Sequence, residues 1–408
     1  MQAIGLKTEH LINPMGVDFT APRLFWNCDG GVKQTAYQIL AADDAGTVLW
    51  DSGRVESSAM WAQWGGAPVE PKTKVLWKVR LWDEENTPGD WSEGTFETGI
   101  NAWSAQWITG DYPVNKKERY PVDCFRKCFD AADIKKARLY ITACGLYEAH
   151  INGQRVGNFV RAPGITDYRK RVQYQTYDVT ALLQGGENTL TVQLADGWYR
   201  GSCGAWGLKN QYGRETKLLA QLEITHTDGS VQTVITDESW QWSSDGPIRF
   251  ADNKDGEMVN ANNIPSYQGK AKVTSHPVTP TASNNVPVTE HERLKAKRIT
   301  TPSGKTVLDF GQNIAGYGEF TVTAHAGEKI RLRFGELLDE NGEFTQKNIQ
   351  CANKNITTPL QQVVYTCKEG ENHYKTTFAI FGFQYVLVET DVAVQPENFT
   401  AIAVYSDM

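Results

Sequence analysis

The residues of this chain whose chemistry could be catalytic are three pairs of neighbouring carboxylates: Asp237 with Glu238, Asp255 with Glu257, and Glu336 with Asp339. Hydrolysis of a glycosidic bond needs one carboxyl group as acid and, in inverting enzymes, an ionised second one roughly 6.5–9.5 Å away. Adjacent positions on a strand point to opposite faces, however, and acidic residues in turns normally face water. We therefore predict solvated or capping roles for these pairs and no catalytic residue in this chain.

One aromatic segment is a candidate sugar-binding loop: Asp196-Gly197-Trp198-Tyr199-Arg200-Gly201, followed by Trp206 and Tyr212. The apolar face of a sugar ring stacks on an aromatic ring, while carboxylate and guanidinium groups satisfy its hydroxyls. The residues that we predict to bind carbohydrate are Asp196, Trp198, Tyr199, Arg200 and Trp206. In the alternative interpretation, Trp198 and Tyr199 fill the end of a β-sandwich core and Arg200 covers a ring.

Two acidic loops, residues 252–257 and 339–343, supply the oxygen ligands that calcium prefers. Neither contains the full pattern of an EF-hand, and the second is equally explained as the tip of a hairpin. Calcium therefore stays open as a ligand, and no metal-binding residue is predicted. Cys124 and Cys128 lack a second pair of Cys or His residues, which argues against zinc.

The elements that must position these residues are β-strands, because helical periodicity is almost absent from the sequence. Runs of about five to eight β-branched, aromatic or alternating residues recur, bounded by Gly, Asn, Asp and Pro. The run from Leu76 to Leu81 alternates as a half-buried strand does. Asn152-Gly153 predicts a type I′ hairpin, and Asp228-Gly229 repeats the signal. The sequence thus predicts an all-β chain.

We predict tandem β-sandwich modules along the chain. Residues 1–100, which end in WSEGTFETG, look like a fibronectin type III-like sandwich, and residues 101–263 are expected to form a jelly-roll-like one. Residues 264–292 are rich in Pro, Ser, Thr and Asn and are predicted to be a linker. Strands then resume, so residues 293–408 are expected to form a second jelly-roll-like sandwich.

Composition restricts the partners and the compartment. The 408 residues include 13 Trp, 16 Tyr and 15 Phe, enough for several packed cores. The net charge of −7 is spread along the chain, so we expect neither nucleic acid nor a membrane as a partner. Seven irregularly spaced cysteines predict reduced thiols, and the N-terminus lacks the pattern of a signal peptide. We infer a cytoplasmic protein, although a secreted chain without its leader would look the same.

Several long segments resemble the non-catalytic front half of bacterial α-L-rhamnosidases of glycoside hydrolase family 78: ARLYITACGLYEAHINGQRVG, LADGWYRGSCGAWG, VLDFGQNIAGYGEF and GELLDENGEF. The resemblance covers nearly the whole chain and is strongest over residues 137–240 and 307–388. The chain departs from the family at Phe381-Gly382-Phe383-Gln384-Tyr385, where the family usually reads His-Gly-Phe-Arg-Tyr. Any ion pair of that arginine is therefore lost.

The resemblance implies a parent enzyme that hydrolyses terminal α-L-rhamnosides with inversion, through acidic residues of an (α/α)6 barrel. No segment of this sequence could form that barrel, so we expect an accessory β-sandwich region that is inactive alone. Its expected partners are the missing barrel and, through the parent enzyme, rhamnose-containing glycosides. A surface that the barrel would cover would also favour self-association into a homo-oligomer. The alternative is a stand-alone, lectin-like carbohydrate-binding protein.

Overall fold

The computed structural model describes residues 1–115, 117–204, 207–352 and 357–407. Regular structure in these residues is nearly all β-strand, which confirms the predicted all-β chain of β-sandwich modules. The helical turns are α1 (Gly197–Arg200), η1 (Thr180–Leu182) and η2 (Pro396–Asn398). No helix within the described ranges is long and apolar enough to cross a membrane.

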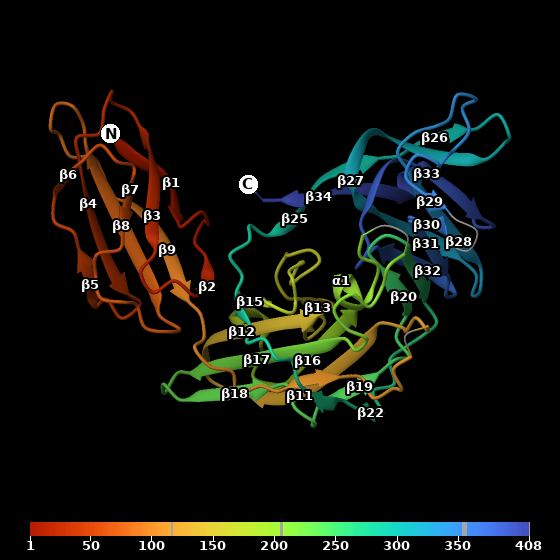
Figure 1. Cartoon of the computed structure of the whole chain (residues 1–408), viewed down its shortest axis with the longest axis horizontal. Helices are drawn as coiled ribbons and strands as arrows, with labels where there is room; N and C mark the ends of the chain where they lie inside the picture. Colours follow the sequence, from red (N-terminus) through yellow and green to blue (C-terminus); the bar gives the residue numbers. More distant parts are fainter. Residues whose placement is uncertain (116, 205–206, 353–356, 408) are drawn as a thin grey trace. The chain divides into compact units, whose positions relative to one another are not determined.

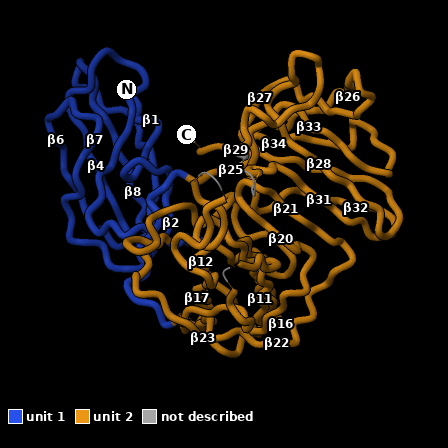
Figure 2. The backbone as a smooth tube through the Cα atoms, turned by 45° about the vertical axis from the view of Figure 1, so that its right-hand side comes forward, with its two compact units in different colours: residues 1–104, 174–177, 281–286 blue, residues 105–173, 178–280, 287–408 orange. Residues whose placement is uncertain are grey.

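The chain divides into two compact units, which Figure 2 colours separately. Unit 1 consists of residues 1–104, 174–177 and 281–286. Unit 2 consists of residues 105–173, 178–280 and 287–408. The two units are therefore not consecutive segments of the sequence.

Unit 1 contains two sheets that share one core (Figure 1). The larger sheet runs in the order β2 (Met15–Val17), β9 (Ser92–Thr98), β8 (Lys74–Trp82), β4 (Ala36–Asp43) and β5 (Val48–Asp51), with β6 (Val55–Glu56) on β4. The smaller sheet runs in the order β1 (Gln2–Thr8), β3 (Arg23–Asp29) and β7 (Trp61–Gln63). The alternation predicted along β8 is confirmed, because Trp77 and Val79 are fully buried while Leu76 is 43% exposed.

Two later strands, β15 (Gln173–Asp178) and β24 (Thr281–Ala282), carry the remaining residues of unit 1. Asp18 holds both of them. Its Oδ1 accepts a hydrogen bond from the Tyr174 hydroxyl at 3.1 Å, and its Oδ2 accepts one from the Ala282 N–H at 2.6 Å. One carboxylate thus ties two distant parts of the sequence to the first hundred residues.

Unit 2 begins with two sheets from the middle of the chain (Figure 1). One contains, in order, β23 (Lys272–Thr274), β10 (Trp107–Thr109), β17 (Lys217–His226) and β12 (Ile134–Cys144), with β18 (Val231–Ile235) on β17. The other contains, in order, β14 (Gln154–Arg155), β13 (Leu146–Ile151), β16 (Gly186–Ala195), β11 (Asp123–Ala131), β19 (Gln241–Ser243) and β22 (Gly269–Lys270).

The two predicted hairpin turns both join neighbouring strands. Asn152 and Gly153 connect β13 to β14 and have φ angles of 51° and 79°, which a type I′ turn requires. Asp228-Gly229 connects β17 to β18, but only Gly229 has a positive φ, of 87°. The second turn is therefore not of type I′, because Asp228 keeps an ordinary backbone conformation.

The last sheet of unit 2 gathers strands from two distant parts of the chain. Its order is β20 (Ile248–Asp252), β21 (Gly256–Asn260), β31 (Gln362–Thr366), β28 (Lys329–Gly335), β33 (Phe381–Thr390), β27 (Thr306–Ala324), β34 (Phe399–Ser406) and β25 (Val288–Lys295). Two further strands, β26 (Lys297–Thr300) and β32 (Gly370–Lys375), pair with β27. A separate pair is formed by β29 (Cys351–Ala352) and β30 (Thr357–Thr358).

The hairpin of β20 and β21 reaches this sheet through a parallel pairing with β31, from Gly256 opposite Gln362 to Asn260 opposite Thr366. Gly256 makes this approach possible. Its φ is +103°, and a Cβ atom there would lie 1.7 Å from the Gln362 carbonyl oxygen. Strands from residues 101–263 thus complete a sheet built mostly from residues 293–408, and the predicted four-part division stays a prediction.

Replacing Gly256 by Ala should destabilise unit 2 by roughly 3 kcal/mol or more, because the backbone of β21 must move away from β31. Gly311→Ala is the matched control. Its φ is also positive, at +77°, but no atom lies within 4 Å of the added Cβ, so the cost should stay near about 1 kcal/mol. Thermal unfolding followed by circular dichroism measures both variants, and equal melting temperatures would contradict the close approach.

Candidate functional site

The predicted sugar-binding loop leaves β16 and forms the four-residue helical turn α1. Gly197 begins it with a φ of +54°, and a Cβ atom there would lie 2.8 Å from the Leu146 side chain. Only glycine fits a position with both properties. The sequence did not reveal this turn, because four residues are too few to show a helical period.

Asp196 and Arg200 are both buried, each 4% exposed, and they face each other. The Arg200 Nε donates to Asp196 Oδ1 at 2.6 Å, and its Nη1 donates to the Tyr112 hydroxyl. The guanidinium also lies 5.1 Å above the centre of the Tyr120 ring. Burial lowers the pKa of Arg200, but Asp196, Tyr112 and Asp123 outweigh burial and raise it overall. The two side chains therefore form an ion pair inside the protein.

Arg119 extends this ion pair to the β20–β21 hairpin. Its Nε lies 3.5 Å from Asp196 Oδ2, and its Nη2 lies 2.5 Å from Asp252 Oδ2. Asp252 also accepts hydrogen bonds from the backbone N–H groups of Ser202 and of residues 254 and 255. Burial raises the pKa of Asp252, but Arg119 and these N–H groups lower it overall. The result is a chain of alternating charges, Arg200–Asp196–Arg119–Asp252, which we call the buried ion chain.

The two aromatic residues of the loop occupy different environments. Trp198 is half-buried against the core of the last sheet, and the Arg161 guanidinium lies 4.2 Å above its ring. Burial lowers the pKa of Arg161 to about 10. Tyr199 is 4% exposed, and its ring packs edge-on against Tyr168 with centroids 5.2 Å apart. Trp206 lies outside the described residues, and sugar binding by this loop stays a prediction.

Several acidic residues of the two candidate calcium loops bond to the protein itself. Asp255 Oδ1 accepts from the Leu360 N–H at 3.1 Å, and Glu257 accepts from the N–H groups of residues 377–379. Asp339 Oδ1 accepts two N–H groups of its own hairpin turn. Within the described part of the chain, no group of three or more His, Cys, Asp or Glu residues could hold a metal ion.

Two carboxyl groups have the raised pKa that a general acid requires, since burial raises the pKa of both Asp123 and Glu257. Each is at most 1% exposed. Asp123 accepts hydrogen bonds from Trp242 Nε1 at 2.9 Å and Thr216 Oγ1 at 2.8 Å, and Glu257 accepts one from the Tyr374 hydroxyl. A carboxyl group closed off in this way cannot reach a glycosidic oxygen.

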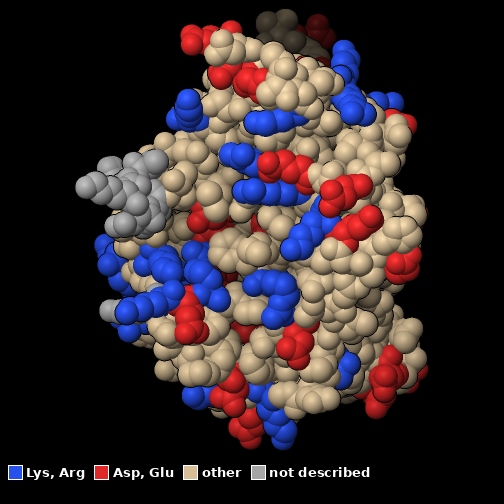
Figure 3. Space-filling model, turned by 90° about the vertical axis from the view of Figure 1, so that its right-hand side faces the viewer, with Lys and Arg blue, Asp and Glu red and all other residues tan. Residues whose placement is uncertain are grey.

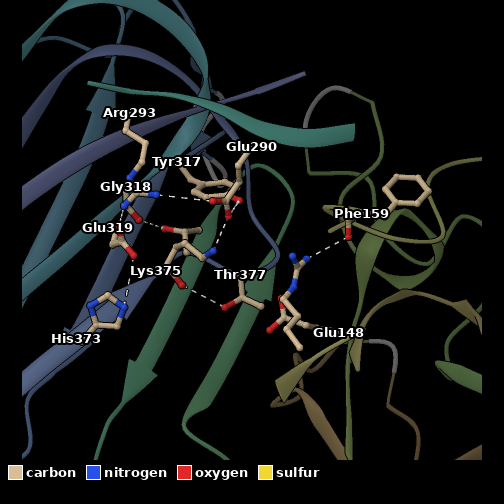
Figure 4. Close-up of polar contacts among 12 residues, drawn as sticks. Glu148, Phe159, Glu290, Arg293, Tyr317, Gly318, Glu319, His373, Lys375 and Thr377 are labelled. Carbon is tan, nitrogen blue, oxygen red and sulfur yellow. Dashed lines mark hydrogen bonds and ion pairs between the residues drawn. The ribbon is translucent and has the colours of Figure 1, made fainter. Parts of the chain in front are cut away.

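A second group of polar side chains is in part exposed (Figure 4); its members come from β13 and β14 and from β25, β27 and β32. Glu290 of β25 lies 2.5 Å from Lys375 Nζ and accepts a hydrogen bond from the Tyr317 hydroxyl at 2.8 Å. From the other side, Arg155 donates to Glu148 at 3.1 Å. Burial raises the pKa of Glu290, but the hydrogen bonds from Lys375 and Tyr317 lower it overall. We call these five residues the Glu290 cluster; it can hydrogen-bond a polar ligand or a facing surface.

Charges of both signs are interspersed over the face of the molecule in Figure 3. The net charge of the chain is only −7. A mixed surface of this kind produces little long-range field. The polar groups of this chain therefore act over short distances, through the contacts described above.

The fold defines a set of tandem β-domains. Three domain families match the chain in order: "Rha78A-like, N-terminal immunoglobulin domain" over residues 3–102, "Alpha-L-rhamnosidase N-terminal domain" over residues 132–301, and "Bacterial alpha-L-rhamnosidase concanavalin-like domain" over residues 299–405. The chain therefore belongs to the α-L-rhamnosidase family, as a region of its N-terminal β-domains. The first match is an immunoglobulin domain, so the fibronectin type III-like assignment stays a prediction.

The chain spans about half the length of the relatives that it matches. α-L-Rhamnosidases of Formosa agariphila and Alteromonas sp. (strain LOR) are each 32% identical to 93% of this chain, which covers 44% of their length. The crystal structure of the Aspergillus terreus α-L-rhamnosidase superposes on the full chain with a TM-score of 0.92 at 32% identity, over 49% of its own length. A Streptomyces avermitilis α-L-rhamnosidase complexed with L-rhamnose gives 0.86 at 25% identity, over 57% of its own length.

Arg200→Met should destabilise unit 2 by about 3–5 kcal/mol, because it leaves the buried Asp196 carboxylate without its closest partner. Arg169→Met is the matched control, since Arg169 pairs with Asp167 at 2.8 Å but its side chain is 70% exposed. Losing that exposed pair should leave the melting temperature nearly unchanged. Thermal unfolding measures both, and a small shift for Arg200→Met would show that the buried ion chain is not needed.

Lys375→Met should raise the pKa of Glu290, because it removes the hydrogen bond and positive charge that lower it. A carboxyl group with a lowered folded pKa stabilises the fold above its unfolded pKa, and this stability is lost as the pH falls. The variant should therefore lose less stability on acidification than the parent. Carbon-detected NMR titration of Glu290 measures the pKa. Lys368→Met, at an exposed position of the same sheet region, should leave it unchanged.

Proposed function

We propose that this chain is the accessory β-domain region of an α-L-rhamnosidase and has no hydrolytic activity alone. The observation that carries the proposal is the ordered match of three domain families, in a chain that spans 44–55% of the length of its curated relatives. In the whole enzyme, a catalytic domain would hydrolyse terminal α-L-rhamnosides. The β-domains would pack against that domain and shape the surroundings of its active site.

The polar groups of unit 2 support a structural role. The carboxyl groups with raised pKa, Asp123 and Glu257, are closed off from solvent. The buried ion chain fixes the β20–β21 hairpin relative to α1, which keeps the sheets of unit 2 in one arrangement. A rigid support of this kind suits a domain that positions another one.

We also propose that the protein works in a reducing compartment such as the cytoplasm. All seven cysteines are free, and burial raises the pKa of Cys124 and Cys144 to about 12 in each case. Thiols of this kind are protonated and unreactive. Structural disulfides are typical of secreted proteins, so their absence among these cysteines supports the proposal.

The purified chain should not hydrolyse an aryl α-L-rhamnoside, because it offers no exposed pair of acid and base in its described residues. The Aspergillus terreus α-L-rhamnosidase, assayed on the same substrate, is the positive control. Release of the aryl group measures turnover. Activity that disappears in Glu148→Gln or Glu290→Gln, the two partly exposed carboxylates of the Glu290 cluster, would overturn the proposal.

A further inference from the structure

The outward face of the small sheet of unit 1 carries a stacked aromatic pair. Phe25 of β3 lies opposite Trp61 of β7, and their rings stack with centroids 6.3 Å apart and planes inclined by 29°. Side chains alternate along these strands, so Leu24 and Ala62 point into the core instead. Trp61 remains 47% exposed. The pair therefore lies outside the core of unit 1.

Two polar side chains lie beside this pair, two residues away on the same two strands. Arg23 of β3 lies opposite Gln63 of β7, and both are exposed. Arg23 Nε and Nη2 donate to Glu9 Oε2 at 2.9 and 2.6 Å, which fixes the guanidinium next to the rings. Gln63 Nε2 donates to the Ala21 carbonyl at 2.7 Å, which fixes the amide. The Arg23 guanidinium lies 5.6 Å from the centre of the Phe25 ring, so a hydrogen-bonding group is held beside the exposed aromatic surface.

We propose that this surface, Arg23, Phe25, Trp61 and Gln63, binds a neutral glycan chain that contains rhamnose; we call it the Trp61 face. The apolar faces of sugar rings would stack on Trp61 and Phe25. Their hydroxyls would meet the Arg23 guanidinium and the Gln63 amide, which supply donors and an acceptor. The choice of rhamnose rests on the proposed function, whereas the glycan chemistry rests on the residues of the face.

Charge and size favour a neutral glycan over other occupants. Arg23 is paired with Glu9, so the two polar side chains add no net charge that would select a polyanion. The aromatic pair is also small. A stable protein interface buries about 800 Å² on each partner, whereas one Trp and one Phe expose far less than that. A narrow chain of sugars needs only a strip of this width.

Titration calorimetry with a soluble neutral rhamnan tests the proposal on the full chain. The parent should bind with a dissociation constant in the millimolar range or below. Trp61→Ala should weaken binding at least tenfold, while Trp61→Tyr, which keeps a ring at that position, should stay within about threefold of the parent. Because Trp61 lies outside the core, both variants should keep the melting temperature of the parent.

Tyr405→Ala is the matched control, since Tyr405 is also 47% exposed but belongs to unit 2; it should bind as the parent does. Unchanged binding in Trp61→Ala, or equal loss in Tyr405→Ala, would overturn the proposal. Self-association that Trp61→Ala abolishes, without binding of rhamnan, would overturn it in favour of a protein partner. The rhamnoside assay is independent: absence of rhamnan binding ends only this inference, whereas turnover by the chain ends the proposed accessory role.

Discussion

The buried ion chain Arg200–Asp196–Arg119–Asp252 is the constraint on which the arrangement of unit 2 depends. A charge inside a protein is tolerated only when it is paired and hydrogen-bonded, so the three buried members, Arg200, Asp196 and Asp252, cannot lose their partners without a large cost. The buried ion chain begins at α1, continues through Arg119 in the segment before β11, and ends at the β20–β21 hairpin. These contacts hold the β20–β21 hairpin in place relative to α1, and so they also set the position at which β21 pairs with β31.

Apolar packing near the buried ion chain also connects α1 to the last sheet of unit 2. Trp198 follows Asp196 closely in the sequence, and its ring lies between the Arg161 guanidinium and the core of the last sheet. The Glu290 cluster adds partly exposed charges between strands of the same two regions (Figure 4). Three kinds of contact therefore join the middle sheets of unit 2 to its last sheet: buried ion pairs, the Trp198 ring and partly exposed charges.

Local patterns in the sequence predicted the local structure well. The alternation of residues 76–81 and the Asn152-Gly153 turn depend on neighbouring residues, and both have the predicted conformation. The pairing of Gly256 with Gln362 depends on residues far apart in the sequence, and no periodicity encodes it. The sequence of the loop showed the residue types of a polar site. It did not show that Asp196 and Arg200 would pair with each other, with aromatic rings packed against the Arg200 guanidinium. Trp61 was missed because β7 has only three residues, too few to show which side faces solvent.

The division of unit 1 into three stretches of sequence has a consequence for its synthesis. Asp18 is made early, whereas its partners Tyr174 and Ala282 emerge from the ribosome much later. The Asp18 carboxylate must stay hydrated while most of the middle of the chain is translated. The two sheets formed by the first hundred residues can fold during this time, but without their contacts to β15 and β24. Unit 1 can therefore be completed only after the segment around residue 282 has been made, although most of its residues are translated much earlier.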